Sequence, residues 1–191
     1  MTLHIWNDFW DLRVKECPCD AHFCDYLDEN NVTGKSIFHF GTGGHHLLGL
    51  HNVEKGLNNA ILGITAAPGE HKTYETMIIE NPELGWGYKV FFGDIYQLDA
   101  RLLPMFDIVT LFHVGEFRTE KNDVYGALTD YQMVKLLAGQ TRPGGLIAFY
   151  AGSYAYNLAK PIHDQLVEEG YLTPKGQYKT LPLFERTAKA V

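Results

Sequence analysis

The sequence predicts an α/β protein, a three-layer sandwich in which helices cover both faces of a mainly parallel sheet. From Ser36 onward, short apolar runs alternate with longer amphipathic or polar stretches, which is the rhythm of repeated βαβ units. Several runs are apolar at nearly every position, as expected when both faces of a strand are buried. After the first run, the glycines Gly41, Gly43 and Gly44 favour a tight strand-to-helix turn beside a ligand crevice, or simply a turn.

Length and composition indicate one domain over residues 1–191. A core at 35–191 follows a helical extension or lid at 1–34. The formal net charge of −7 disfavours non-specific binding to nucleic acids, and the Lys and Arg residues are scattered. No apolar run is long enough to span a bilayer, and three cysteines do not make a disulfide framework. We therefore expect a soluble, cytoplasmic protein without membrane or nucleic-acid partners.

The N-terminal region predicts two helices. Apolar residues of 4–15 cover a wide helical face, and Pro18 ends this segment. Asp20 is placed to cap a second helix over 21–29. Trp6, Phe9 and Trp10 then form either a lid over the crevice or part of the core.

Apolar runs and turn residues define the other elements. The expected strands are 36–41, 60–65, 88–92, 106–112 and 146–150. The expected helices are 45–57, 70–80, 96–102, 124–137 and 156–169. After Gly170 the pattern predicts an antiparallel hairpin at the sheet edge, with strands 177–180 and 183–189 joined at Leu181-Pro182.

This order resembles that of class I S-adenosylmethionine-dependent methyltransferases over residues 35–191. The matching features are the glycine turn, a strand ending in Gly93-Asp94, the strand FDIVTLF and the segment LLAGQTRPGGLIAFY before the hairpin. The resemblance implies a Rossmann-like core, S-adenosylmethionine as cofactor and methyl transfer. Because the chain is short and acidic, we expect a small-molecule acceptor; the oligomeric state stays open.

The resemblance also implies positions for the cofactor. The glycine turn lies along its methionine part, Asp94 hydrogen-bonds its adenine, and Phe112 and His113 border its sulfonium. The full set of expected cofactor residues is His39, Gly41, Thr42, Gly43, Thr65, Asp94, Ile95, Phe112 and His113.

Three positions depart from the family pattern. His39 replaces the acid before the first glycine, and His45 replaces the third glycine. Thr65 stands where an acid normally holds the ribose, and Glu70 is the nearest carboxylate. Losing that contact costs about 1.5 to 3 kcal/mol, as for hydrogen bonds to charged groups. A non-catalytic ligand-binding protein or partner subunit, or other chemistry on the same cofactor, therefore stays open as an alternative.

A nicotinamide-binding fold is the alternative class, because it also opens with a strand, a glycine turn and a helix. Its G-x-G-x-x-G pattern requires glycine where His46 stands and an acid at the end of the second strand. Both are missing, which disfavours this class.

His113 and Glu116 are the candidate catalytic residues. They follow the fourth predicted strand, where the loop opens toward the crevice, so either side chain is placed to act as a base. Alignment alone supplies roughly 7 to 11 kcal/mol when the geometry is right. A histidine that merely packs at the strand end is the alternative for His113. Tyr150, Ser153, Tyr154 and Tyr156 are candidates for acceptor contact or an ordinary loop.

We predict no metal site from the sequence. Cys17, Cys19, His22 and Cys24 have the spacing C-x-C-x-x-H-x-C, which does not match the usual zinc pairs, and a helix would turn His22 and Cys24 to different faces. Small buried cysteines are the simpler interpretation. Around the glycine turn, His39, His45 and His46 are expected to contact the cofactor or pack. A metal is disfavoured there because adjacent imidazoles rarely point the same way.

Overall fold

A computed structural model describes residues 3–191 and contains helices and strands in the predicted alternation. The strands are β1 (Ser36–Phe40), β2 (Ala60–Thr65), β3 (Tyr88–Phe92), β4 (Phe106–Leu111), β5 (Thr141–Phe149), β6 (Leu172–Tyr178) and β7 (Leu181–Arg186). The helices are α1 (Cys19–Glu29), α2 (Leu47–Glu54), α3 (Pro68–Glu80), α4 (Leu84–Gly87), α5 (Glu120–Asp123), α6 (Asp130–Gly139) and α7 (Tyr156–Glu168), with 3-10 turns η1 (Ile95–Gln97) and η2 (Ala100–Leu102).

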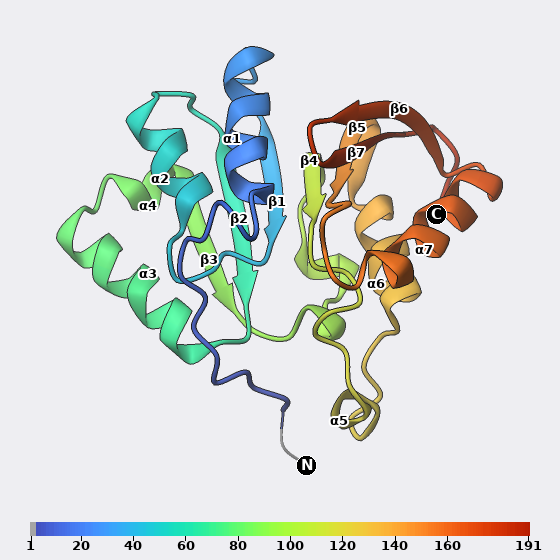
Figure 1. Ribbon diagram of the computed structural model, residues 1–191, viewed down its shortest axis with the longest axis horizontal. Coiled ribbons are helices and arrows are strands. Elements are labelled where there is room, and N and C mark those ends of the chain that lie inside the picture. Colours follow the sequence, from blue (N-terminus) through green and yellow to red (C-terminus); the bar gives the residue numbers. More distant parts are fainter. Residues whose placement is uncertain (1–2) are drawn as a thin grey trace.

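Within residues 3–191 the strands form one seven-stranded sheet in the order β3-β2-β1-β4-β5-β7-β6 (Figure 1). The first five strands are parallel, and β7 is antiparallel to both β5 and β6. The predicted mainly parallel sheet with a C-terminal antiparallel hairpin is confirmed. β1 lies between β2 and β4, so its carboxyl end opens between the ends of these two strands.

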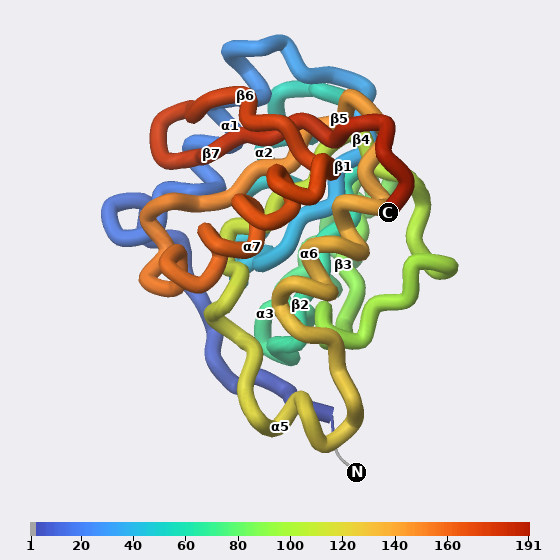
Figure 2. The backbone as a smooth tube through the Cα atoms, turned by 90° about the vertical axis from the view of Figure 1, so that its right-hand side faces the viewer, coloured from blue at the N-terminus to red at the C-terminus, as the bar shows by residue number. Residues whose placement is uncertain are grey.

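Two apolar layers hold the helices to the sheet. On one face, Phe23 and Leu27 of α1 and Leu48 of α2 pack with Ile37 and Ile61. The other face carries a second core in which α6 and α7 pack on β1, β4 and β5, at residues Phe38, Val109, Met133, Leu137, Ile147 and Leu166. Ile37 and Phe38 lie in different layers because successive strand residues point to opposite faces. Figure 2 shows α6 and α7 together on one side of the sheet.

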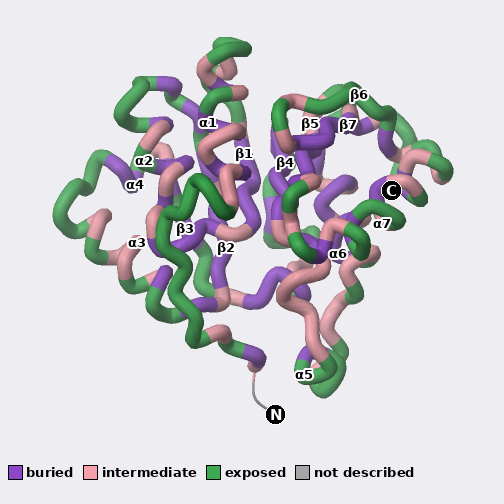
Figure 3. Tube along the Cα trace, in the orientation of Figure 1, coloured by how far each residue is buried: buried purple, intermediate pink, exposed green. Residues whose placement is uncertain are grey.

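The N-terminal segment, residues 3–16, is extended and ends in a turn, so the predicted helix over 4–15 is wrong. Long-range backbone contacts replace helical ones: Trp6 donates to the Ala66 carbonyl at 3.1 Å, and Gly44 donates to the Trp10 carbonyl at 2.9 Å. The segment forms a strap, residues 3–16, in which Ile5, Phe9, Trp10, Leu12 and Val14 all stay substantially exposed. Figure 3 shows this strap as mostly exposed beside buried strands.

Other predicted boundaries shift by a few residues. The region 96–102 forms two 3-10 turns instead of a helix, because Asp94 and Asp99 each cap a short turn. The helix predicted at 124–137 begins at Asp130, where Thr129 and Gln132 form a capping box. The hairpin turns at 179–180, before the predicted Leu181-Pro182, so β6 is longer than its predicted strand and β7 begins and ends earlier than predicted. Among residues 3–191, no helix has the length and apolar character needed to cross a bilayer.

Candidate functional site

A cavity of about 500 Å³ opens at the carboxyl ends of β1 to β4. Its floor includes Gly41 after β1, Thr65 at the end of β2, Asp94 after β3 and His113 after β4. Parallel strands bring these separated residues to one edge of the sheet, which is where open α/β sheets bind ligands. The sequence-predicted residues Gly41, Gly43, Thr65, Asp94, Ile95, His113 and Glu116 all line this one cavity.

The glycine turn is shaped by close contacts. Gly41 has a φ of 90°, and a Cβ there would lie 2.6 Å from the His113 ring. Gly43 has a φ of 54°, and a Cβ would lie 2.5 Å from His45 Nε2. A side chain at either position would therefore meet both backbone strain and an imidazole. The turn needs glycine to bring its backbone beside His113.

The end of β2 carries an acid that comes from the next helix. Thr65 Oγ1 donates to Glu70 Oε2 at 2.7 Å, and the Trp10 N–H donates to Glu70 Oε1 at 3.3 Å. Burial raises the pKa of Glu70, although these two hydrogen bonds act in the opposite direction. The first turn of α3 therefore supplies the carboxylate that is missing at the end of β2.

Asp94 follows β3 and is fully engaged by the protein. Its Oδ1 accepts the Tyr96 N–H at 2.9 Å. Its Oδ2 accepts Asn122 Nδ2 at 2.9 Å and the Tyr125 hydroxyl at 2.6 Å. No sequence pattern pointed to these two partners, which lie in the α5 loop, residues 119–126. Asp94 thus fixes both η1 and this loop at the cavity edge.

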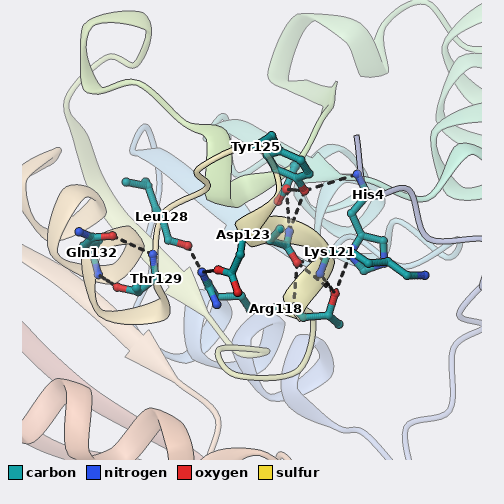
Figure 4. A network of polar contacts seen from close by, with 11 residues as sticks. His4, Arg118, Lys121, Asp123, Tyr125, Leu128, Thr129 and Gln132 are labelled. Atoms are coloured by element: carbon teal, nitrogen blue, oxygen red, sulfur yellow. Dashed lines mark hydrogen bonds and ion pairs between the residues drawn. The ribbon is translucent and has the colours of Figure 1, made fainter. Parts of the chain in front are cut away.

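The same loop holds the start of the strap. His4 Nδ1 lies 3.3 Å from Thr119 Oγ1 and from Asn122 Oδ1. The backbone N–H of His4 donates to the Tyr125 hydroxyl at 3.4 Å. Figure 4 shows His4 and Tyr125 side by side in this network. Trp6 follows and packs edge-on against Phe117. The strap is therefore tied to both the β2 side and the β4 side of the cavity, and its Trp6 and Trp10 line that cavity.

His113 and Glu116, the two candidate bases, both line the cavity and lie next to each other. His113 Nδ1 is 3.2 Å from Glu116 Oε2, and Ser153 Oγ donates to Glu116 Oε1 at 2.5 Å. Burial alone would lower the pKa of His113, but the Glu116 carboxylate outweighs it and the pKa is raised. The pair resembles an imidazole held in orientation by a carboxylate. Tyr150, Ser153 and Tyr154 also border this end of the cavity, whereas Tyr156 does not.

Three predicted cofactor residues do not line the cavity. His39 is 1% exposed and points under the sheet edge, where Nδ1 pairs with Thr110 Oγ1 at 2.7 Å and Nε2 lies 3.7 Å from Asp20 Oδ1. Phe112 packs against Phe23 and His39, and Thr42 is buried in the turn. His39 occupies the Ile37 face of β1, which explains why its imidazole meets α1 and not the cavity.

The four residues of the C-x-C-x-x-H-x-C pattern separate in space. His22 Nδ1 pairs with Thr180 Oγ1 at 2.8 Å, and Cys24 is buried in the α1 core. Cys17 and Cys19 instead line the cavity with their sulfur atoms 3.4 Å apart. The sequence pattern therefore contains two residues of the cavity and two that only build the fold.

Comparison with known proteins identifies the fold. No protein-family model matches the chain, and no curated protein matches it in sequence. A putative S-adenosylmethionine-dependent methyltransferase from Methanococcus maripaludis is similar with a TM-score of 0.64 at 10% identity, over 92% of this chain and 89% of that one. A putative RNA methyltransferase from Pyrococcus horikoshii gives 0.58 at 11% identity, over 97% and 94%.

An O-methyltransferase family protein from Burkholderia thailandensis gives a TM-score of 0.58 at 13% identity and covers 88% of this chain. The chain spans 56% of the length of that protein. Together with the sheet order, these similarities show that the chain has the class I methyltransferase fold, as the sequence predicted. At these identities the likeness concerns the fold, and the acceptor differs among the neighbours.

Proposed function

We propose that the protein binds S-adenosylmethionine in this cavity and transfers its methyl group to a small-molecule acceptor. The observation that carries the proposal is the convergence of Gly41, Glu70, Asp94 and His113 on one cavity at the carboxyl edge of a class I sheet. In this arrangement the methionine part lies along the glycine turn. Glu70 faces the ribose hydroxyls, and Asp94 with the Ile95 backbone borders the adenine.

The catalytic part of the proposal concerns His113 and Glu116. Methyl transfer breaks the bond between the sulfonium sulfur and the methyl carbon while the acceptor forms its own bond to that carbon, and sulfur keeps the electron pair. Most of the rate then comes from alignment. His113 Nε2 is placed to accept the proton of the acceptor, with Glu116 holding Nδ1. The strap would exclude water from the reaction.

A small acceptor fits the charge and the shape of the site. A net charge of −7 repels a phosphate backbone, and the strap lies across the cavity where a macromolecule would have to enter. The RNA-modifying alternative is distinguished by assaying S-adenosylhomocysteine production with small acceptors and with RNA. The free thiols of Cys17, Cys19 and Cys24 support a reducing compartment, and hence the cytoplasm.

One observation favours a non-catalytic ligand-binding protein as the second candidate. The two carboxylates that we propose as cofactor contacts already accept hydrogen bonds from the chain itself, Glu70 from Trp10 and Asp94 from Asn122. Cofactor binding would have to share or displace these donors.

Calorimetric titration with S-adenosylmethionine and S-adenosylhomocysteine, with NAD as control, tests the proposal. Micromolar binding of either, together with turnover on a small acceptor, supports it. Binding without turnover across a broad acceptor panel supports the second candidate, and no binding contradicts both.

A further inference from the structure

Cys17, Cys19 and His113 form a cluster of metal-binding groups that the proposed methyl transfer does not use as a set. The two sulfur atoms are 3.4 Å apart, and Cys19 Sγ lies 3.9 Å from His113 Nε2. All three donor atoms lie within 4.8 Å of one another. We propose that these residues bind one Zn²⁺ ion whose fourth coordination position faces the cavity.

The distances fit tetrahedral zinc. With Zn–S near 2.3 Å and Zn–N near 2.0 Å, tetrahedral angles separate two sulfur ligands by about 3.8 Å and a sulfur from a nitrogen by about 3.5 Å. The two short distances in the cluster are within a few tenths of an ångström of these values. Side-chain rotation, chiefly of Cys17 toward His113, therefore suffices to bring the three donor atoms into coordination with one ion.

The backbone presents both thiols in the same direction. Pro18 stands between the cysteines, and its ring restricts the backbone of this short C-x-C segment. Cys19 is the first residue of α1, a helix of 11 residues, so the thiol pair stands at the positive end of that helix. Two thiolates and one Zn²⁺ sum to zero charge, so the ligand set adds no net charge beside the buried Asp20 carboxyl, whose Oδ1 lies 3.7 Å from Cys19 Sγ.

The second independent observation is the setting of the histidine. Zinc-binding histidines almost always present their other ring nitrogen to a carboxylate or carbonyl. His113 Nδ1 is buried, makes no hydrogen bond of normal geometry and lies 3.2 Å from Glu116 Oε2 as a close ion-pair contact, and Glu116 is itself held by Ser153. The other ring nitrogen, Nε2, lies 3.9 Å from Cys19 Sγ. The carboxylate, imidazole and two sulfurs are aligned as in a metal site with its supporting shell.

Three protein ligands with one open position are typical of catalytic zinc sites. The open side here faces the cavity, which Cys17, Cys19, His113 and Glu116 all line. Because the His113 ring packs on Gly41, the ion would lie at the sulfonium end of the cofactor. This placement rests on the proposed function, whereas metal binding itself does not.

A bound ion changes the part played by His113. Its Nε2 would be a ligand instead of the base, and an acceptor hydroxyl or thiol on the fourth position would lose its proton to bulk solvent on binding, because coordination would lower its pKa. The acceptor then attacks as its anion. The acceptor class is therefore a small molecule with a hydroxyl or thiol nucleophile.

The test uses the full chain, reduced and stripped with a chelator, and titrated with Zn²⁺ and then with Co²⁺ in the absence of cofactor. We expect one ion per chain and a cobalt spectrum with a thiolate charge-transfer band and intense tetrahedral bands. Cys17→Ser and Cys19→Ser should each weaken Zn²⁺ binding by about 100-fold or more, because each removes a ligand. Glu116→Gln should weaken it by about 10-fold, as expected for a supporting carboxylate.

Cys24→Ser and His22→Ala are the matched controls, since both lie in the same sequence pattern but outside the cluster. They should bind Zn²⁺ like the unmodified chain, and circular dichroism should show that each variant is folded. The proposal is overturned if the reduced chain binds no stoichiometric Zn²⁺, or if the Cys17→Ser/Cys19→Ser double variant retains the affinity. Titration with S-adenosylmethionine, run separately, shows whether the proposed function fails independently.

Discussion

The side chains of Thr65 and Glu70 are joined by a hydrogen bond of 2.7 Å from the threonine hydroxyl to the carboxylate. This contact connects the end of β2 to the first turn of α3, where Ala67 also donates its N–H to Thr65 Oγ1. The carboxylate is thus fixed at the edge of the cavity, although β2 itself ends without an acid. A carboxylate is therefore available at the cavity five residues after Thr65, and we propose it as the ribose-binding acid.

Replacing Glu70 with glutamine tests that role. Glutamine keeps the size of the side chain and an acceptor for Trp10, but it removes the charge. We expect the affinity for S-adenosylmethionine to fall about 10- to 100-fold, since hydrogen bonds to a charged group contribute about 1.5 to 3 kcal/mol. Glu75→Gln is the control, because Glu75 lies on the same helix and pairs with Lys72 at the surface. Equal affinities of both variants, measured by calorimetry, would remove Glu70 from the cofactor site.

Asp94→Ala is expected to change both binding and stability. It removes the acceptor for the Tyr96 N–H and leaves Asn122 without its buried partner, so the free energy of unfolding should fall by about 1 to 3 kcal/mol. The domain should stay folded, because that loss is less than the stability of an ordinary domain. Urea unfolding measures the first effect, and titration with S-adenosylmethionine measures the expected loss of affinity.

Tyr125→Phe separates the two roles of Asp94. It removes the hydroxyl's hydrogen bond to the carboxylate and its contacts from Asn122 and the His4 N–H, but leaves the carboxylate in place. It should lower stability by about 1 kcal/mol and keep cofactor affinity. If Asp94→Ala binds the cofactor as well as Tyr125→Phe does, Asp94 is only a structural cap.

His39 should make stability depend on pH. Burial, with smaller contributions from the imidazoles of His113, His45 and His46, lowers the pKa of His39 to about 3, against 6.5 for an unperturbed histidine. Between pH 6.5 and 3 the unfolded chain therefore binds a proton that the folded chain does not, so this residue lowers stability as pH falls through that window. The slope is about 1.4 kcal/mol per pH unit for one proton.

His39→Gln removes this titration while keeping a polar side chain near Thr110. Urea unfolding of both proteins at several pH values from 4.5 to about 7.5 should give a shallower pH dependence for the variant below pH 6.5. If the two plots of unfolding free energy against pH run parallel, the pKa of His39 is the same in the folded and unfolded chains.

The sequence predicted the elements whose cause is local. β2 and β3 have the predicted ends, because each is an apolar run closed by residues that disfavour strands. Residues 4–15 were misassigned because Trp6 bonds to Ala66 and Trp10 to Gly44, contacts that no local periodicity encodes.

The candidate site divides in the same way. Positions at strand ends were predictable from topology, since strand order alone brings Gly41 and Asp94 to one edge. The partners Asn122 and Tyr125 come from a distant loop, and Cys19 meets His113 across 94 residues. The spacing of the N-terminal pattern pointed away from a metal, because the third ligand that we propose, His113, follows β4 and is not part of that pattern.

The strap is tested by adding one methyl group beneath it. A Cβ at Gly44 would lie 2.1 Å from Phe9 Cζ, so Gly44→Ala has to displace the Phe9 ring and loosen the hydrogen bond from Gly44 to Trp10. We expect faster hydrogen exchange at residue 44 and faster cofactor dissociation, because residues 6–16 cover the cavity. The double variant Phe9→Ala/Gly44→Ala relieves the clash and should restore the slow exchange. If Gly44→Ala alone releases cofactor at the original rate, the strap does not retain the ligand, and its aromatic residues serve only to pack against the cavity rim.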